Sequence, residues 1–486
     1  MAYHTMQFAE LEREHKLFSL TYHGVPYWQL LRHPISECCL HHADKVETVL
    51  PRHTEKTRFA KMFFAAVRET VRQNARLHSL RHAEVLLFRT EGERRIGDET
   101  VNPLFDCIDY TGLTTQSVWD TQEFLKLPAA ARYTIAPAVL RGYLYKLWYR
   151  FTRKWTRDKA AYAQLQSTVA LVNRTFGTQI TQAEVIGYEN EILYLISAHK
   201  GFVPYFKKLL RRVQPKVIVM NCYYMVPSLM MIQAARELGI QTVELQHGHI
   251  YNHISYCFAD KTPQGKLVPD VFFAFNRFFA NACTLTDATR IVVTGYPFLE
   301  RSLAHYDRAP LDDKTVVFYS QVSLGHKLTK FMLDFAALAA PHGYHVVCKL
   351  HPAECADWRT MYPELITAQI DAVDDDRSTN VYAYVATHRY QVVADSTTAF
   401  EIAAVPGARL YIPLSCPHGN TQPMLELGFA QGVENPAALL AAILADASGA
   451  PSAAASERNA AVEPFWPTGA AQNVGNALRA LVSAEL

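Results

Sequence analysis

From residue 215 onward, short apolar runs alternate with amphipathic stretches, a rhythm that predicts repeated units of strand, loop and helix. We expect strands at 217–220, 241–245, 271–275 and 290–294, with a helix at 228–238. That helix is followed by Gly239, a residue type common at helix ends. A strand, a helix and a second strand in succession indicate a parallel sheet, whose functional loops lie at the carboxyl ends of its strands.

A second series of the same kind follows a polar segment at 301–314, which contains Pro310 and has the composition of an interdomain connection. We expect strands at 316–320, 344–350, 390–394 and 409–412, helices at 328–339, 380–386, 399–404 and 471–482, and a flexible Ala/Ser-rich element at 445–461. The pattern predicts an α/β protein with two Rossmann-like, doubly wound parallel sheets. We place them in an N-terminal domain at 1–305 and a C-terminal domain at 306–486, with a cleft between the two.

The N-terminal part lacks this rhythm and is rich in aromatic and basic residues. Residues 18–31 suit a short strand and a turn before a helix, and 56–81 suit a basic amphipathic helix. A strand at 84–88 follows and leads into a charged loop at 89–95, and functional side chains are common on such loops. We therefore expect an aromatic and basic cap on the first domain.

Residues 140–155 interleave Leu, Tyr and Trp with Arg and Lys. A basic amphipathic helix of this type can lie on an anionic membrane, which would give the protein peripheral contact with the inner membrane on its cytoplasmic face. The alternative is a buried aromatic stripe whose cations extend to solvent. The sequence leaves both interpretations open.

Composition excludes some classes of protein. The 486 residues are 49% hydrophobic and 19% charged, as in a globular protein with a large core, and the net charge of +2 gives no reason to expect a nucleic-acid partner. No apolar run is long enough for a transmembrane helix, and 1–16 lacks the apolar region of a secretory signal, so we expect a cytoplasmic protein. The nine scattered cysteines are typical of reduced thiols, and Cys38 and Cys39 of apolar packing.

Two strand ends carry the candidate chemistry of the second series. The apolar run at 344–350 ends in Lys349, His351 and Pro352, which predicts an imidazole at a strand tip, because the proline disfavours a helical backbone before it. The strand at 390–394 ends in the hydroxyl-rich turn at 395–398. Thr398 and Glu401 have the spacing of a capping box, which predicts a helix start suited to a phosphate.

The first series has a comparable strand end. Gln246, His247 and Gly248 follow the strand at 241–245, and the glycine permits a tight turn beside the imidazole. A lone histidine at such a place is more often structural than catalytic, but His249 and His253 follow closely. We retain both interpretations of His247.

The order of four motifs, at 246–248, 295–297, 349–352 and 395–401, resembles that of GT-B glycosyltransferases of bacterial capsule and O-antigen biosynthesis. The capsule enzymes related to CDP-glycerol polyol-phosphate transferases, and the bacterial sialyl- and Kdo-transferases, are the most similar in motif order. The resemblance covers about residues 215 to 430. It implies a GT-B fold whose C-terminal domain binds the nucleotide donor.

By this resemblance, His351 contacts the donor phosphate and assists departure of the nucleotide. The other donor-binding residues that it implies are Lys349, Pro352, Ser396, Thr397, Thr398, Gly295 and Glu401. Hydrogen-bond donors aimed at the leaving oxygen would stabilise the charge that it gains in the transition state. We expect no metal and no cofactor, because no DxD motif lies at a strand end and Asp374 to Asp376 have the polar surroundings of a solvated loop.

Transfer also requires a base for the acceptor hydroxyl. A histidine in a similar motif of the glycerophosphate-transferring relatives corresponds to His247. The sialyltransferases use an acid in a different motif, of which Glu91 and Gly92 match the last two positions. His247 is the preferred base, and Glu91 is the alternative.

The predicted function is therefore metal-independent transfer of a sugar, such as CMP-activated sialic acid or Kdo, from a nucleotide donor to a surface polysaccharide or lipid-linked glycan. One alternative is transfer of a polyol phosphate from a CDP-polyol. Another is a nucleotide-sugar epimerase or a non-transferring binding protein. Epimerases need several acids beside a histidine, whereas hydroxyls and histidine predominate here, which favours transfer.

Overall fold

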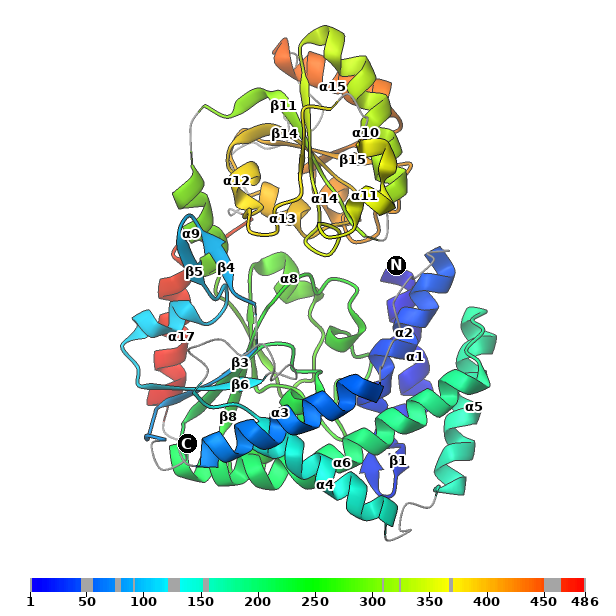
Figure 1. The fold of residues 1–486 in the computed structure, drawn as a ribbon, viewed down its shortest axis with the longest axis vertical. Helices are drawn as coiled ribbons and strands as arrows, with labels where there is room; N and C mark the ends of the chain where they lie inside the picture. The colour runs from blue at the N-terminus through cyan, green and yellow to red at the C-terminus, as the bar shows by residue number, and fades with distance from the viewer. Residues whose placement is uncertain are drawn as a thin grey trace. The chain divides into compact units, whose positions relative to one another are not determined.

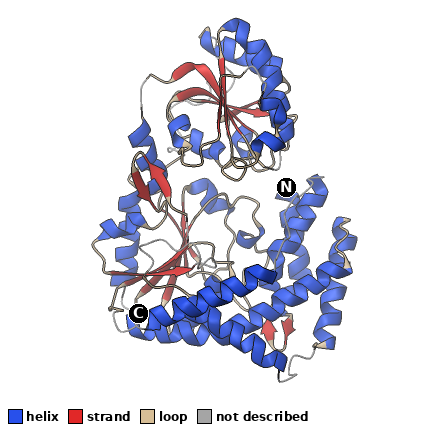
Figure 2. Cartoon of the chain, in the orientation of Figure 1, coloured by secondary structure: helices blue, strands red, loops and turns tan. Residues whose placement is uncertain are grey.

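The computed structural model describes residues 2–44, 56–74, 80–90, 92–120, 132–151, 157–307, 310–322, 325–366, 370–449 and 465–484. The chain divides into two compact units, each with a six-stranded parallel sheet flanked by helices (Figure 1 and Figure 2). The expected α/β class with two parallel sheets is therefore confirmed.

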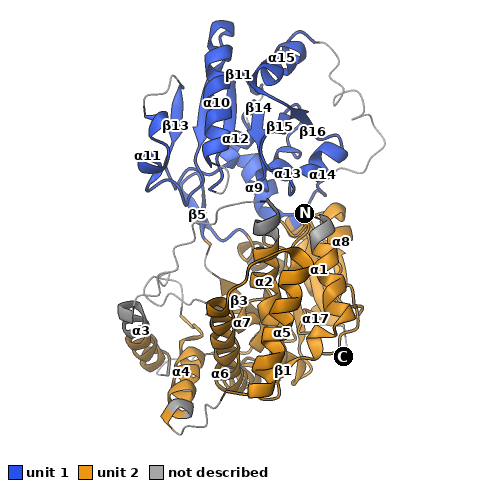
Figure 3. Ribbon diagram, turned by 90° about the vertical axis from the view of Figure 1, so that its right-hand side faces the viewer, with its two compact units in different colours: residues 1, 93–103, 296–470 blue, residues 2–92, 104–295, 471–486 orange. Residues whose placement is uncertain are grey.

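The two units are built from interleaved parts of the chain (Figure 3). The N-terminal unit comprises 2–92, 104–295 and 471–486, and the C-terminal unit comprises 93–103 and 296–470. This division differs from the expected boundary between residues 305 and 306 at three places: the start of the second unit, a hairpin and the last helix.

The sheet of the N-terminal unit has the strand order β10-β9-β8-β7-β3-β6. Its strands are β3 (Val85–Thr90), β6 (Thr115–Asp120), β7 (Val217–Met220), β8 (Gln241–Leu245), β9 (Val271–Ala274) and β10 (Arg290–Val293). Its longer helices are α1 (Ala2–Glu14), α2 (Trp28–Asp44), α3 (Lys56–Asn74), α4 (Ala136–Phe151), α5 (Lys159–Phe176), α6 (Gln182–Val213) and α7 (Val226–Arg236). Shorter pieces are η1 (Leu17–Ser19), β1 (Thr21–Tyr22), β2 (Val25–Pro26), η3 (Asp106–Thr111), η4 (Ile254–Tyr256) and α8 (Arg277–Ala282).

Alternating residues of these strands face two different layers, as strand geometry requires. On one face, Val217 and Val243 share a core with Val474 and Leu478 of the C-terminal helix α17 (Ala470–Ser483). On the other face, the ring of Phe88 contacts Phe206 of α6, with the ring centres 5.7 Å apart. The sheet is therefore covered on both faces.

The expected cap is present at the N-terminus. The antiparallel pair β1 and β2 turns through His23 and Gly24, both with positive φ, and α2 follows. The buried Arg32 of α2 forms two hydrogen bonds to the carboxylate of Glu12 in α1, which also accepts from the Trp28 indole. This buried ion pair of Arg32 and Glu12 holds the two helices together.

The sheet of the C-terminal unit has the order β13-β12-β11-β14-β15-β16. Its strands are β11 (Asp312–Tyr319), β12 (His345–Lys349), β13 (Ala372–Asp374), β14 (His388–Val393), β15 (Arg409–Pro413) and β16 (Ala430–Val433). Its helices are α9 (Pro297–Tyr306), α10 (Gly325–Ala339), η5 (Ala340–His342), α11 (Trp358–Met361), η6 (Pro363–Leu365), α12 (Tyr382–Val385), α13 (Thr398–Ile402), α14 (Gln422–Glu426) and α15 (Pro436–Ala447).

Helices cover both faces of this sheet as well. Phe318 and Val392 pack in one core with Phe335 of α10 and Leu439 of α15. On the opposite face, the amide of the buried Gln391 donates to the carbonyl of Val385 in α12 at 3.0 Å. The doubly wound arrangement is therefore confirmed for this unit too.

The segment expected to be a charged loop at 89–95 contains regular structure. β3 extends to Thr90, and the hairpin of β4 (Arg94–Ile96) and β5 (Glu99–Val101) begins soon after. The hairpin belongs to the C-terminal unit, where Asn380 donates to the carbonyl of Arg95 at 2.6 Å and Arg301 pairs with Glu99. Contacts with residues distant in the chain therefore stabilise regular structure in a segment whose own sequence is polar.

Three other expectations need correction. The supposed connection at 301–314 is mostly α9 and the start of β11. The last helix, α17, packs on the N-terminal sheet, because its apolar stripe completes that core. Of the Ala/Ser-rich run, residues 445–447 end α15 and the part from residue 450 lies outside the described residues.

All nine cysteines are free thiols. Across the described ranges, no helix combines the length and the apolar character needed to cross a bilayer.

Candidate functional site

The C-terminal sheet brings two predicted strand ends to the same height. Lys349 of β12 and Val393 of β14 both pair with Tyr319 of the strand between them, β11. His351 and Asp395 each follow two residues later, so their backbones lie about two strand spacings, or about 10 Å, apart. The chain leaves β11 towards β12 and returns on its other side at β14, which makes this edge a topological switch point of the kind that binds ligands.

His351 is exposed at this edge, and the fold determines which of its ring nitrogens carries the proton. The Ala353 N–H donates to Nδ1 at 3.2 Å. In the neutral ring, the proton is therefore on Nε2, which can donate to a ligand. Desolvation and the charge of Arg94 lower the pKa of His351, against the opposite effect of Glu354. The imidazole is thus a neutral donor at pH 7.

The loop after β12 is held by Glu354, a residue that the sequence motifs did not predict. Its buried carboxylate accepts from the His351 N–H at 3.0 Å and from the Tyr362 hydroxyl at 2.6 Å. A Cβ on Gly325, at the start of α10, would lie only 1.8 Å from that hydroxyl. In the sequence, the sign of this role is that Glu354 stands three residues after the histidine at the strand end.

Lys349 has a different environment from the one expected of a phosphate ligand. It is buried, with its ammonium 3.3 Å from the Asp374 carboxylate and donating to the carbonyl of Asp376 at 3.1 Å. Asp374 ends the strand β13 and is itself largely buried, so the expectation of a solvated acidic loop was wrong at this position. The pair fixes the edge of the sheet beside His351.

The turn at 395–398 also differs from its prediction. The short helix α13 begins at Thr398 after Thr397, with no side-chain cap, so the expected capping box of Thr398 and Glu401 is absent. Ser396 is half-buried and its hydroxyl lies 3.2 Å from that of Thr398, whereas Thr397 is exposed. The structure thus places two hydroxyls, on Ser396 and Thr397, within reach of solvent at the switch point.

The preceding carboxylate, Asp395, organises the next loop. It accepts from the backbone N–H of Asn420 at 2.6 Å and from its side-chain amide at 2.9 Å. Thr421 adds a hydrogen bond to the carbonyl of Ala394 at 2.5 Å. The ends of β14 and β15 are therefore cross-linked, and the turn is held rigidly by polar contacts.

Glu401 points into a group of tyrosines. Desolvation raises the pKa of its carboxyl to about 7, against the lowering effects of the Tyr382 hydroxyl and Arg94. Tyr382 is buried and also interacts with Tyr296, the residue after the predicted Gly295. Gly295 itself has φ +90, which suits the sharp turn into α9.

Arg94 is the second residue that sequence reasoning missed. It lies on the hairpin that joins the C-terminal unit, and its charge lowers the pKa of both His351 and Glu401. Its guanidinium is thus within electrostatic range of the histidine at the end of β12. The sequence gave no local sign of this, because more than 250 residues separate Arg94 from His351.

In the N-terminal unit, His247 follows β8 and lies among tyrosines. Its Nε2 is 3.4 Å from the hydroxyl of Tyr224 and its Nδ1 is 3.5 Å from that of Tyr256. Burial lowers the pKa of His247 to about 4, so the ring is neutral at pH 7. A neutral imidazole is the form that can accept a proton.

A buried acid, Glu244, lies beneath this histidine. Its carboxylate accepts from the Tyr256 hydroxyl at 2.6 Å and from the Tyr223 N–H at 3.2 Å, and it is 3.8 Å from Nδ1 of His247. Complete burial raises its pKa to about 8, so it is protonated at pH 7. In the sequence, the signal for this residue is a lone acid inside the apolar strand at 241–245.

Two further histidines join this group. His33 of α2 stacks on His253, with ring centres 4.8 Å apart, and both rings lie near Tyr224. Burial lowers the pKa of both imidazoles. The N-terminal cap therefore contributes directly to the surroundings of His247.

The alternative base, Glu91, lies outside the described residues. Its neighbour Thr90 donates to the side chain of Asn221 at 3.0 Å, which joins the ends of β3 and β7 at the switch point of the N-terminal sheet. Among the described side chains, no three His, Cys, Asp or Glu residues are placed to hold one metal ion.

No family model and no curated protein matches the chain. Solved structures resemble it distantly. A UDP-N-acetylglucosamine 2-epimerase is 11% identical, with a TM-score of 0.45, and the match covers 84% of this chain and 98% of that one. The UDP-GlcNAc 2-epimerase of Neisseria meningitidis bound to UDP-GlcNAc is 10% identical, with a TM-score of 0.46 and coverages of 82% and 99%. A glycotransferase of kitacinnamycin is 12% identical, with a TM-score of 0.44 and coverages of 83% and 96%.

At such low identities and TM-scores, this likeness says nothing about the chemistry of the chain. The chemistry must therefore be inferred from the residues that the two sheets place at their strand ends.

Proposed function

We propose that the chain is a glycosyltransferase that moves a sugar from a nucleotide donor to a bacterial surface polysaccharide or a lipid-linked glycan. The observation that carries this proposal is the arrangement at the switch point of the C-terminal sheet. There, His351, whose Nε2 carries the proton, and the hydroxyl residues Ser396 and Thr397 follow the two strands that flank β11 in matching register. Neutral and hydroxyl donors of this kind suit the phosphate oxygens of a nucleotide.

In the proposed reaction, the bond between the sugar carbon and the donor phosphate oxygen breaks, and the nucleotide leaves with that electron pair. His351 and Ser396 donate hydrogen bonds to this phosphate, and Arg94 adds positive charge. The paired Lys349 positions the end of β12 and does not itself meet the ligand. Glu401 and Pro352 shape the surroundings.

In the same reaction, the acceptor hydroxyl attacks the sugar carbon and loses its proton to a base. We assign this role to His247, because its ring is neutral at pH 7 and partly exposed, with tyrosine hydroxyls beside both nitrogens. The protonated Glu244 beneath it leaves the site without a fixed negative charge.

A second candidate function is epimerisation of a nucleotide sugar. The observation that favours it is the pairing of an imidazole with a protonated carboxyl, His247 and Glu244, since exchange of a proton at a sugar carbon requires both an acid and a base. The sequence alone had shown few acids near the histidines. The structure supplies one.

One experiment separates these functions. The full chain is incubated with CMP-, UDP- and CDP-activated sugars and with CDP-glycerol, each with and without a glycan acceptor, and the products are separated by chromatography. Free nucleotide that forms only with acceptor supports transfer, and CDP-glycerol as the sole active donor indicates polyol-phosphate transfer. An isomerised sugar nucleotide formed without acceptor would replace transfer by epimerisation.

A further inference from the structure

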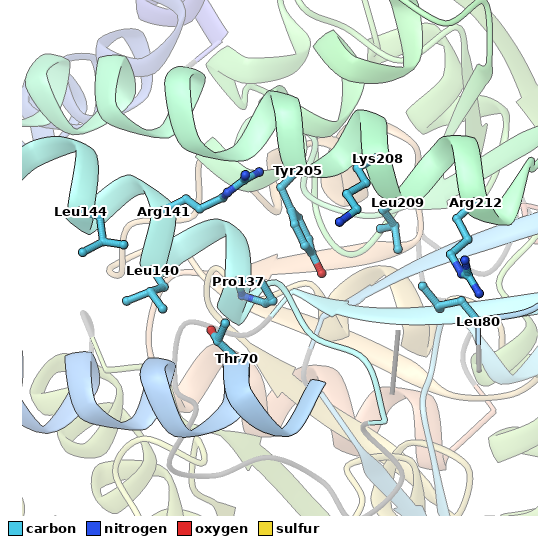
Figure 4. Close-up of a pocket in the computed structure, with 10 residues that line it drawn as sticks. All are labelled: Thr70, Leu80, Pro137, Leu140, Arg141, Leu144, Tyr205, Lys208, Leu209 and Arg212. Atoms are coloured by element: carbon cyan, nitrogen blue, oxygen red, sulfur yellow. The ribbon is translucent and has the colours of Figure 1, made fainter. Parts of the chain in front are cut away.

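A hollow of about 370 Å³ lies in the N-terminal unit between α3, α4 and α6, away from the residues assigned to catalysis (Figure 4). Its wall is mostly apolar and comes from Leu80, Pro137, Leu140, Leu144 and Leu209. A second, shallower hollow adjoins it and shares Leu144 and Arg141. The volume of the first hollow is that of a site for a small molecule or for part of a larger amphiphile.

The helices that form this surface are locked together where the two hollows meet. A Cβ on Gly201 of α6 would lie 2.6 Å from the backbone nitrogen of Gly142 in α4. The two helices therefore cross in backbone contact, which only glycine permits. The apolar surface on either side of this crossing is preformed.

The charged side chains that line the two hollows are all positive. Arg141, Lys208 and Arg212 line the first hollow and Lys200 lines the second, and the lining of neither contains an acid. Among the described residues, Arg141 and Lys208 form no ion pair, although both side chains are exposed. Figure 4 shows Lys208 extending from α6 between Tyr205 and Leu209. An occupant that complements this surface is apolar with an anionic group.

Large apolar side chains beside the hollows are exposed to solvent. On α4, the side chains of Leu144, Trp148 and Phe151 are 51%, 48% and 82% exposed. Trp148 also lines the second hollow. Exposed aromatic residues beside cations are characteristic of surfaces at the boundary between water and lipid.

We propose that this surface binds an anionic phospholipid of a membrane, with the lipid phosphate at Arg141 and Lys208 and an acyl chain in the hollow between α3, α4 and α6. The expectation from the sequence concerned only residues 140–155, of which 152–155 lie outside the described residues. The structure adds α6 and α3 to the surface and gives it a hollow. This proposal does not depend on the transfer reaction.

The test is flotation of the full chain with vesicles, without nucleotide. We expect binding to vesicles of phosphatidylcholine mixed with phosphatidylglycerol, and little binding to phosphatidylcholine alone. The double variant Arg141→Glu with Lys208→Glu should bind the anionic vesicles at least about tenfold more weakly, because each cation near an anionic surface adds to the attraction.

The matched control is Lys159→Glu with Arg174→Glu on α5, which makes the same change of net charge at exposed positions of another helix. It should bind anionic vesicles like the unchanged protein. Equal losses for both double variants would show a nonspecific effect of net charge and would overturn the proposal. Circular dichroism checks the fold, and Phe151→Ser, at a highly exposed position, serves as an independent variant that should also weaken binding.

Insertion of an acyl chain is tested with phosphatidylglycerol brominated on its chains, which quenches nearby tryptophan fluorescence. We expect quenching that is largely lost in Trp148→Phe. Undiminished quenching in that variant would place the lipid elsewhere. Release of the protein from vesicles by glycerol phosphate at concentrations comparable to the lipid would instead identify a free phosphate as the occupant.

Discussion

The two six-stranded sheets both carry their candidate residues at the carboxyl end of a strand, but in opposite surroundings. In the C-terminal unit, His351 is exposed, and the buried ammonium of Lys349 beside it is paired with Asp374. In the N-terminal unit, Glu244 is buried and His247 mostly so, and burial keeps both uncharged at pH 7.

This difference suggests that the two strand ends have different chemical roles. Exposed hydrogen-bond donors at the strand ends of the C-terminal sheet suit an anionic ligand, which must be able to enter and leave. Buried groups whose pKa values are shifted in opposite directions suit the handling of a proton. The following predictions test whether the two strand ends differ in this way.

The largest effect is expected from His247→Ala. Loss of the base should lower kcat for transfer by about 10²- to 10⁴-fold, the range of general base catalysis. Binding of the nucleotide, measured by calorimetry, should be unchanged, because this residue belongs to the N-terminal sheet. A weakened nucleotide affinity with normal kcat would reverse the assignment of the two strand ends.

His351→Ala should lower kcat/KM for the donor by about 10²- to 10³-fold, because one preorganised donor to the leaving phosphate is lost. The control is His345→Ala at the other end of β12, where an exposed imidazole contacts Asp371. Steady-state kinetics of both variants should show the loss only at residue 351. Near-normal activity of His351→Ala would remove the basis of the donor site.

Arg94→Ala should weaken nucleotide affinity by about tenfold, the size expected for a hydrogen bond to a charged group. Its neighbour Arg95 is exposed and lies 4.0 Å from Asp98, which makes Arg95→Ala a matched control. Titration calorimetry with the nucleotide measures both. Equal affinities of the two variants would mean that the hairpin does not reach the ligand.

The smallest effect concerns the pH dependence of stability. Burial raises the pKa of Glu244 to about 8 in the folded state. The contribution of this residue to the free energy of unfolding is therefore fully present below its unfolded pKa and is lost as the pH rises towards 8. In Glu244→Gln, the free energy of unfolding should lose this fall with pH, which amounts to roughly 1 kcal/mol per pH unit. Urea unfolding at a series of pH values measures it.

The control for this prediction is Glu237→Gln, at the end of α7, where hydrogen bonds from Lys207 and Gln233 lower the pKa of the acid. Its pH slope between mildly acidic and mildly basic conditions should match that of the unchanged protein. An identical slope for Glu244→Gln would show that this carboxyl is ionised in the folded protein.

The sequence predicted the strand-rich parts of this fold well, because buried parallel strands read as continuous apolar runs. The runs at 217–220, 241–245 and 409–412 were located to within a residue. The short strands β13 and β16 were missed, since β13 is mainly polar at its end and β16 contains Gln431 and Gly432. Edge strands of this kind carry little of the apolar signal.

Of the candidate site, the sequence determined which residues stand at strand ends. His247, His351 and Ser396 follow apolar runs, and the physics of parallel sheets brings such residues to one edge. The capping box of Thr398 and Glu401 was wrong, because a spacing of three residues does not reveal that Glu401 turns towards Tyr382.

Only the tertiary structure decided the surroundings of these residues. The ion pair of Lys349 with Asp374 and the effect of Arg94 on His351 join segments distant in the chain. Glu244 lies close to His247 in sequence, but its hydrogen-bond partners Tyr223 and Tyr256 come from other segments. Hydrophobic period is a local property, which one stretch of sequence can show. Burial and charge are set by neighbours that the stretch does not contain, and they determine whether a histidine at a strand end holds an anion or accepts a proton.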